Sequence, residues 1–144
     1  MIAKNKSQFT ELSLVRASAI LYKKLDYAKA LESYKSLEMQ AEDPKNNTAA
    51  KIGIMRSSYK LKNYEDAVLY SNKVLAVEKI GKELVDEGHY TIAQSYLAEQ
   101  KLDDAFGEFK ALSNTSKSEM GSEASFQVAN IQFLKNDFKG SQKS

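Results

Sequence analysis

The chain has 144 residues, of which 42% are hydrophobic and 28% charged, and its formal net charge is +2 at pH 7. This size fits one globular domain, and so small a net charge does not argue for nucleic-acid binding, because nucleic-acid phosphates require a dense basic surface. No cysteine is present, which excludes thiol catalysis and thiolate metal sites. One proline, six glycines and the lack of alternating apolar stretches argue against a sheet, so the sequence predicts an all-α protein.

Apolar residues at three- and four-residue steps predict a first helix over about residues 8–24, behind a frayed polar start at residues 1–7. One face of this helix is expected to be buried through Leu12, Val15, Ala19 and Tyr22. A second helix is predicted over about 27–41. It ends at the strongest break of the sequence, around Pro44.

Residues 49–75 predict two further amphipathic helices joined by a turn at Lys62 and Asn63. Asn63 is expected to cap the second of them, with Asp66 three residues later completing a weak capping box. Ala67 matters because only a small residue at this place lets two helices approach closely. One such hairpin cannot bury its own apolar face, which predicts copies of it elsewhere in the chain.

The second half continues the helical pattern after a loop at 77–82. A fifth helix is predicted over about 83–99 and a sixth over 102–112, where Gly107 costs about 1 kcal/mol and is expected to permit close packing. A seventh helix is predicted from near Ser118 to about residue 135, with Ser116 and Glu119 at capping-box spacing. Asn136 and Asp137 then predict an eighth helix that stops almost at once.

The predicted copies share one step, an aromatic or leucine residue followed three positions later by a small residue. The four steps are Tyr27…Ala30, Tyr64…Ala67, Leu102…Ala105 and Phe138…Ser141. The small residues lie about 37, 38 and 36 positions apart, a period typical of solenoids built from helix pairs. Twelve positions before each small residue, the preceding helix carries Ser18, Met55, Ala93 or Ala129.

Three stretches that contain these steps resemble the tetratricopeptide repeat (TPR) family. In order of decreasing similarity they are YKLKNYEDAVLYSNKVL, SYLAEQKLDDAFGEFKAL and LYKKLDYAKALESYKSLE. The resemblance implies a right-handed α-solenoid of antiparallel helix pairs, with about three and a half repeats and seven main helices. It implies one domain over 1–144, with repeats near 8–44, 47–80, 83–115 and an incomplete 118–144. The short last repeat indicates a piece of a longer TPR protein.

Side chains that could carry catalysis are few. His89 is the only histidine, so a structural or surface role is favoured over a catalytic triad or a metal site. The acidic pairs Glu65–Asp66 and Asp103–Asp104 stand in first turns of predicted helices, where they complement the helix dipole. No glycine loop that could cradle phosphate is present. The sequence therefore predicts no enzyme, no cofactor and no metal.

The aromatic residues divide into two sets. Those at repeat positions are expected to pin neighbouring helices together, namely Tyr27, Tyr34, Tyr64, Tyr96, Phe109 and Phe138. The others fall where the resemblance places the concave groove formed by the first helices of the repeats. The groove residues so implied are Tyr22, Lys23, Arg56, Tyr59, Lys60, Tyr90, Gln94, Phe126, Asn130 and Phe133. Aromatic, basic and amide side chains together are typical of a peptide-binding surface, and packing between layers is the alternative for each of them.

The resemblance implies a non-catalytic scaffold that binds a peptide or protein segment in this groove. A structural spacer or self-association module of a larger multi-repeat protein is the alternative, and an RNA-binding helical-repeat protein ranks lower. The inner face of the seventh helix, which includes Phe126, Ala129 and Phe133, is expected to lack a cover, so a homo-oligomer formed through it is a further expectation. No nucleic acid and no membrane span are expected. The missing signal peptide favours the cytoplasm, and excision from a longer exported protein would instead place the chain in the cell envelope. The identity of the partner stays open.

Overall fold

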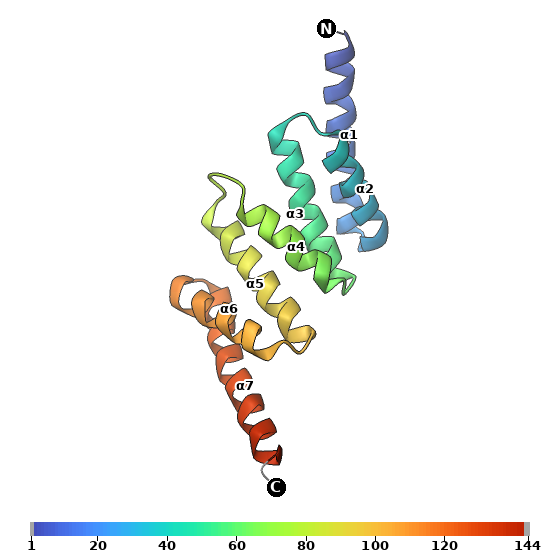
Figure 1. Cartoon of the computed structure of the whole chain (residues 1–144). Helices are drawn as coiled ribbons and strands as arrows, with labels where there is room; N and C mark the ends of the chain where they lie inside the picture. Colours follow the sequence, from blue (N-terminus) through green and yellow to red (C-terminus); the bar gives the residue numbers. More distant parts are fainter. Residues whose placement is uncertain (1, 143–144) are drawn as a thin grey trace. The chain divides into compact units, whose positions relative to one another are not determined.

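The computed structural model describes residues 2–142, with side chains described for residues 10–136. Seven helices form this part of the chain (Figure 1). They are α1 (Ile2–Lys23), α2 (Tyr27–Gln40), α3 (Pro44–Lys60), α4 (Tyr64–Leu75), α5 (Lys82–Ala98), α6 (Leu102–Thr115) and α7 (Glu119–Gln142). No strand occurs among the described residues, so the prediction of an all-α fold is confirmed.

The helices fall into two compact units, residues 1–79 and residues 80–144. In the first unit α1 packs on α2, α2 on α3 and α3 on α4, and α1 also contacts α3. In the second unit α5 packs on α6 and α6 on α7, and α5 also contacts α7. Contacts within each pair and between first helices of successive pairs are those of a helical-repeat solenoid. Whether residues 1–144 act as one domain stays a prediction.

The small residues of the repeat lie in the core, as the sequence predicts. The three described second helices each bury their small residue completely, at Ala30, Ala67 and Ala105. The residues twelve positions earlier, on the paired first helices, are also fully buried, at Ser18, Met55 and Ala93. Each pair of helices therefore meets at the register that the repeat spacing predicts.

The turns inside the three pairs share one backbone geometry. Each first helix is followed by a residue with positive φ, which is 68° at Leu25, 64° at Lys62 and 62° at Gln100. The next N–H returns to a carbonyl five residues earlier, as between Asn63 and Ser58 at 2.8 Å. This is the hydrogen bond of a Schellman turn, which ends a helix and satisfies its last carbonyls. Three equal turns give the pairs one hairpin shape.

Most of the aromatic residues that the sequence predicts to pin neighbouring helices together are packed in the structure. Phe109 is fully buried, and the ring of Tyr34 lies so close to Gly53 that an added methyl group there would overlap it. Tyr27 and Tyr64 are half-buried in edge-to-face aromatic pairs. Tyr96 is half-buried, with the Lys101 ammonium 5.8 Å from its ring centroid. The side chain of Phe138 lies outside the described residues.

Two predicted helix starts were wrong. Helix α1 begins at Ile2 instead of near residue 8, because residues 2–7 contain no helix breaker. Helix α3 begins at Pro44, although the sequence predicts only the end of the preceding helix there. Proline suits the first turn of a helix, where its missing N–H would have no partner. Asp43 caps this start, since its carboxylate accepts a hydrogen bond from the Lys45 N–H at 2.9 Å.

The prediction of an eighth helix was also wrong. Helix α7 continues without a break through Asn136 and Asp137 to Gln142. A turn there would give up several backbone hydrogen bonds of the helix, and neither asparagine nor aspartate prevents a helix from continuing. The sixth helix is also longer than predicted and runs to Thr115.

Three local expectations need correction. The Asn63 side chain does not cap α4 but donates a hydrogen bond to the Asp66 carboxylate at 2.8 Å. Ser118, not Ser116, caps the start of α7, because its hydroxyl accepts a hydrogen bond from the Met120 N–H at 3.3 Å. Gly107 permits no close packing, since a methyl group added there would meet nothing within 4 Å.

The buried face of α1 differs from the predicted one as well. Of the four residues expected inside, Leu12 and Ala19 are exposed, while Val15 and Tyr22 are half-buried. The buried positions of the described part of α1 are Glu11 and Ser18. Polar side chains can take these places because each has partners: Ser18 Oγ lies 2.6 Å from Ser33 Oγ, and Glu11 accepts several hydrogen bonds.

Candidate functional site

The predicted groove residues of the first unit come from α1 and α3, two helices in contact with each other. Tyr22 and Tyr59 are half-buried, and each packs edge-to-face on the first tyrosine of the following helix. The ring centroids are 5.2 Å apart for Tyr22 and Tyr27 and 5.9 Å apart for Tyr59 and Tyr64. These two tyrosines therefore stabilise the helix pairs and offer only part of their surface to a ligand.

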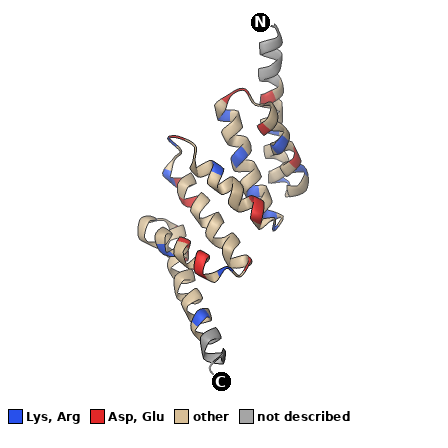
Figure 2. Cartoon of the chain, in the orientation of Figure 1, with Lys and Arg blue, Asp and Glu red and all other residues tan. Residues whose placement is uncertain are grey.

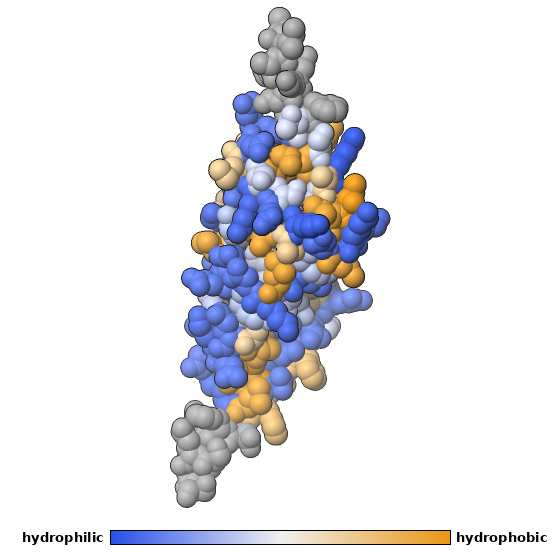
Figure 3. Space-filling model, turned by 90° about the vertical axis from the view of Figure 1, so that its right-hand side faces the viewer, coloured by the Kyte–Doolittle hydropathy of each residue, from blue (hydrophilic) through white to orange (hydrophobic). Residues whose placement is uncertain are grey.

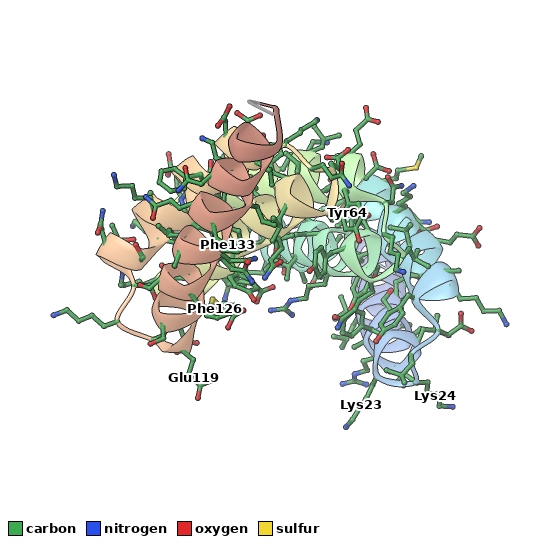
Figure 4. All side chains as sticks on the ribbon, turned by 90° about the horizontal axis from the view of Figure 1, so that it is seen from below. Lys23, Lys24, Tyr64, Glu119, Phe126 and Phe133 are labelled. Atoms are coloured by element: carbon green, nitrogen blue, oxygen red, sulfur yellow. The ribbon has the colours of Figure 1, made fainter. Side chains whose placement is uncertain are left out.

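The basic members of this set lie on the surface. Lys23, Arg56 and Lys60 are exposed, with Lys23 and Lys60 in the last turns of α1 and α3. Figure 2 shows the lysines and arginines along the helices in blue, and Figure 4 labels Lys23. Burial raises the pKa of Tyr34, and the positive charge of nearby Arg56 opposes this shift. The guanidinium group of Arg56 therefore lies within electrostatic reach of Tyr34 on α2.

The predicted groove residues of the second unit come from α5 and α7. On α5, the Gln94 amide donates a hydrogen bond to the Tyr90 hydroxyl at 2.7 Å, and both side chains are half-buried. The Tyr90 ring also packs edge-to-face on Phe109, with 6.3 Å between the ring centroids. These contacts fix the position of Tyr90 and leave the hydroxyl near the surface.

Helix α7 presents two phenylalanine side chains to solvent, and Leu134 beside them is also exposed. Phe126 is 64% exposed and Phe133 is 69% exposed, and they lie along one helix seven residues apart (Figure 4). Seven residues are close to two helical turns, so both rings share a face. Asn130, between them, is half-buried and donates a hydrogen bond to the Gln127 side chain at 3.3 Å. The opposite face of α7 packs in the core through Ala124 and Ile131.

One feature of this unit was missed at the level of sequence. A shallow depression of about 220 Å³ lies between α6 and α7 and is lined by Phe106, Gln132, Lys135 and Asn136. Two ammonium groups lie over the Phe106 ring, that of Lys110 at 5.7 Å and that of Lys135 at 5.6 Å from its centroid. Lys135 also pairs with Asp103. No sequence motif marks this cluster, because its members come from different helices and from non-repeat positions.

His89 and the acidic residues are the side chains to consider for metal binding. His89 is partly exposed, and its Nδ1 lies 3.3 Å from a carboxylate oxygen of Glu108. Within residues 2–142, no three histidine, cysteine or acidic side chains come together in a way that could hold a metal ion. Nor does any described helix have the length and apolar character needed to cross a membrane.

The ten predicted groove residues thus form two sets, one in each unit, and their role in binding stays a prediction. In both sets the tyrosines are tied to neighbouring rings or amides. The basic residues of the first unit and the phenylalanines of α7 are the members most open to solvent. Among the aromatic groove residues, the tyrosines pack against neighbours and the phenylalanines are exposed. The sequence alone did not distinguish these two roles.

Comparison with known proteins shows a likeness to a solved structure. The sequence matches no protein-family model and no curated protein sequence. The crystal structure of the P58(IPK) TPR domain is similar to this chain, with a TM-score of 0.72 at 19% sequence identity. The similarity covers 99% of this chain and 38% of that one, so this chain spans well under half of its length. Together with the helix pairs described above, this likeness shows that the chain has the TPR fold, an all-α repeat of packed helix pairs.

Proposed function

We propose that the chain is a non-catalytic interaction scaffold that binds a peptide or protein segment along the first helices of its repeats. A TPR-like fold supports this role, because stacked first helices form a preformed surface that a ligand can occupy without ordering it. The proposal makes no use of a cofactor or a catalytic group.

The observation that carries the proposal is the charge of the first helices in the first unit. Helix α3 contains four basic residues, Lys45, Lys51, Arg56 and Lys60, and no acidic residue. Helix α1 contains a single acidic residue, Glu11, and its side chain is only 3% exposed. The surface shared by these two helices is therefore positive.

This charge indicates which segments the surface would accept. Residues 1–79 carry 14 basic and 9 acidic residues, so a negative ligand meets an attractive field over the whole unit. Exposed Leu12 and the accessible edges of Tyr22 and Tyr59 add apolar contacts beside the cations. We therefore expect an extended segment that combines acidic and apolar residues.

A peptide-display selection on the purified chain tests this proposal. Selected peptides should be enriched in acidic and apolar residues, and their affinity should fall as salt screens the charges. The variant Arg56→Glu/Lys60→Glu should weaken their binding at least tenfold, because two attractive charges become repulsive. Tyr59 is left unchanged, since its contact with Tyr64 supports the fold.

The control reverses two exposed lysines outside α1 and α3, as Lys35→Glu/Lys79→Glu, and should leave the affinity within a factor of two or three. Equal losses in both variants would indicate only a general charge effect. A selection without enriched peptides would contradict the proposal. So would tighter binding of single-stranded RNA than of any selected peptide, measured with the same variants.

A further inference from the structure

The first helices of the first unit end in the same two residues. Helix α1 ends with Tyr22 and Lys23, and α3 ends with Tyr59 and Lys60. In both repeats the tyrosine stands eight positions and the lysine seven positions before the fully buried alanine of the following helix. Helix α5 has Leu97–Ala98 at these positions, so the tyrosine–lysine pair is repeated within the first unit and not in α5.

The two tyrosines are held in the same way. Tyr22 packs on Tyr27 with 5.2 Å between the ring centroids, and Tyr59 packs on Tyr64 with 5.9 Å. The planes of the rings are inclined by 66° in both pairs. Both tyrosines are half-buried, so each leaves part of its surface to solvent at a fixed place beside its lysine.

The two lysines differ from several others in the chain. Lys29, Lys101 and Lys135 pair with acidic side chains, whereas Lys23 and Lys60 form no ion pair within residues 10–136. Both are exposed and lie in the last turn of their helix, where a positive charge also favours the helix dipole. That favourable position leaves the ammonium groups in solvent, where they can bind a carboxylate.

The distance between the two pairs follows from the packing of the helices. Helices α1 and α3 contact each other and run in the same direction (Figure 1). Packed helices lie about 8–10 Å apart, so the same residues on both helices repeat at about this distance. A polyproline II segment has three residues per turn and rises about 3.1 Å per residue, which places positions i and i+3 on one side about 9 Å apart. The two spacings agree.

The surface of the first unit is mixed in character. In Figure 3 the first unit adjoins the upper grey residues, and on the face shown its hydrophobic residues lie among hydrophilic ones. The unit carries 14 basic and 9 acidic residues, so it attracts a negative segment. A ligand with regularly spaced acidic residues and apolar residues between them is complementary to such a surface.

We infer that the tyrosine–lysine pairs of α1 and α3 bind an extended, polyproline II-like segment whose acidic residues stand three positions apart. One carboxylate would contact Lys23 and the other Lys60, while apolar residues beside them would contact the accessible edges of Tyr22 and Tyr59. This inference rests on the proposed function and specifies the spacing and conformation of its ligand. Aromatic residues that contact preformed polyproline II segments are a common mode of peptide recognition.

Two synthetic peptides of identical composition test the spacing. Both have about twelve residues, mostly proline and alanine, with blocked ends and two glutamates as the only charges. In the first the glutamates stand three positions apart, and in the second they are adjacent. The general field of the unit attracts both equally. The first should bind the native chain at least threefold more tightly in fluorescence anisotropy, because the second can reach only one lysine and a surface ion pair changes affinity by a few fold.

Variants of the protein locate the contact. Lys23→Gln/Lys60→Gln should abolish the difference between the two peptides. The control Lys35→Gln/Lys79→Gln removes the same charge at exposed positions outside α1 and α3 and should keep the difference. Circular dichroism checks that both variants stay folded.

Peptides with a single glutamate changed to glutamine complete double-mutant cycles. One glutamate should couple to Lys23 and the other to Lys60, because each carboxylate contacts one ammonium group.

Equal affinity for the two peptides would overturn the inference, and so would a difference that persists in Lys23→Gln/Lys60→Gln. Absence of binding of both peptides at millimolar concentration would overturn it as well. The peptide selection on the first unit decides the proposed function separately. Selected peptides rich in acidic and apolar residues but without the three-residue spacing would leave the interaction scaffold in place and remove only this inference.

Discussion

Single residues show how the same amino acid acts differently in two helices of this chain. Gly53 in α3 faces the ring of Tyr34, and a methyl group there would overlap ring atoms. Gly107 in α6 is exposed, and a methyl group there would meet nothing within 4 Å. Glycine is thus needed at the first position for packing, whereas at the second it only costs conformational entropy.

The two glycines predict opposite effects of alanine. Gly53→Ala should lower the free energy of unfolding by about 1–2 kcal/mol, because an overpacking cost of about 2–3 kcal/mol exceeds the gain of about 1 kcal/mol in helix propensity. Gly107→Ala should raise it by up to about 1 kcal/mol through propensity alone. Urea unfolding followed by circular dichroism measures both. A stabilising Gly53→Ala would mean that Tyr34 moves aside at no cost.

Glu11 is a buried carboxylate with a structural task. It accepts hydrogen bonds from the Asn46 amide at 2.9 Å and from the Glu42 N–H at 2.5 Å, and so joins α1 to the segment that leads into α3. These bonds, with that of Asn46 the largest contribution, hold the pKa of Glu11 below its ordinary value of 4.5 although burial opposes them. The charged form is therefore the one that the fold stabilises.

The pKa of Glu11 predicts a dependence of stability on pH. A carboxyl group with a lowered pKa in the folded state stabilises the protein above its unfolded pKa, and this contribution is lost as pH falls through the folded value. Glu11→Gln should therefore unfold at lower urea than the native chain at pH 7, and the difference should shrink below about pH 4.5. Glu32→Gln, on the exposed side of α2, is the control and should show no such convergence. A difference independent of pH would assign the role of Glu11 to shape instead of charge.

The sequence predicted the repeat residues well and the surface residues only in part. Ala30, Ala67 and Ala105 are recognisable because a small residue recurs at one spacing, and helix contact requires it there. The roles of Tyr22 and Tyr59 could not be separated by spacing, since a groove position and a contact to the next helix coincide at the end of each first helix. Phe106 with its two lysines could not be predicted at all, because only the packing of α6 on α7 assembles it.

At the scale of elements, the hairpin turns are the most regular feature of the chain. Leu25, Lys62 and Gln100 each adopt a left-handed conformation at the same place in their turns. In residues with a side chain this conformation costs about 1–2 kcal/mol, which is why glycine commonly takes this place. The packing of each helix pair must offset that cost.

The turns predict that glycine stabilises the hairpins. Lys62→Gly should raise the free energy of unfolding by about 0.5–1 kcal/mol, since relief of the left-handed strain exceeds the added entropy of the unfolded chain. Lys60→Gly, two residues earlier in the last turn of α3, should lower it by about 1 kcal/mol because the conformation there is helical. Thermal unfolding distinguishes them. Destabilisation by both changes would show that the turn at Lys62 carries no strain.

The missing turn at Asn136 shows how a helix can continue through a strong turn signal. Asn136 stands where the other repeats have Leu25, Lys62 and Gln100, and asparagine tolerates the left-handed conformation better than any of these. The local signal for a turn is therefore strong, yet α7 continues through it. In the other repeats a helix of 12 to 14 residues follows the turn and packs on its partner. The turn residue alone therefore does not decide whether this chain turns.

At the scale of the whole molecule, the chain consists of two compact units with separate cores. The first is built around residues such as Leu37, Ile54 and Met55, and the second around Phe109 and Ile131. In repeat proteins stability is approximately a sum of repeat and nearest-neighbour terms, so a defect in one core acts mainly on the repeats around it. The boundary at residues 79 and 80 should then also be a boundary in stability.

Native-state hydrogen exchange on Gly53→Ala tests whether stability divides in this way. Amides of α2, α3 and α4 should exchange about five- to thirtyfold faster than in the native chain, which corresponds to a loss of one or two kcal/mol in local stability. Amides of α6 and α7 should change less than twofold, because their core contains none of the atoms that the new methyl group displaces. Gly107→Ala, in the second unit, should slow exchange in α6 and leave α3 unchanged. If either variant changed protection equally in both units, the chain would unfold as one cooperative body, and repeats on both sides of residue 80 would share one stability.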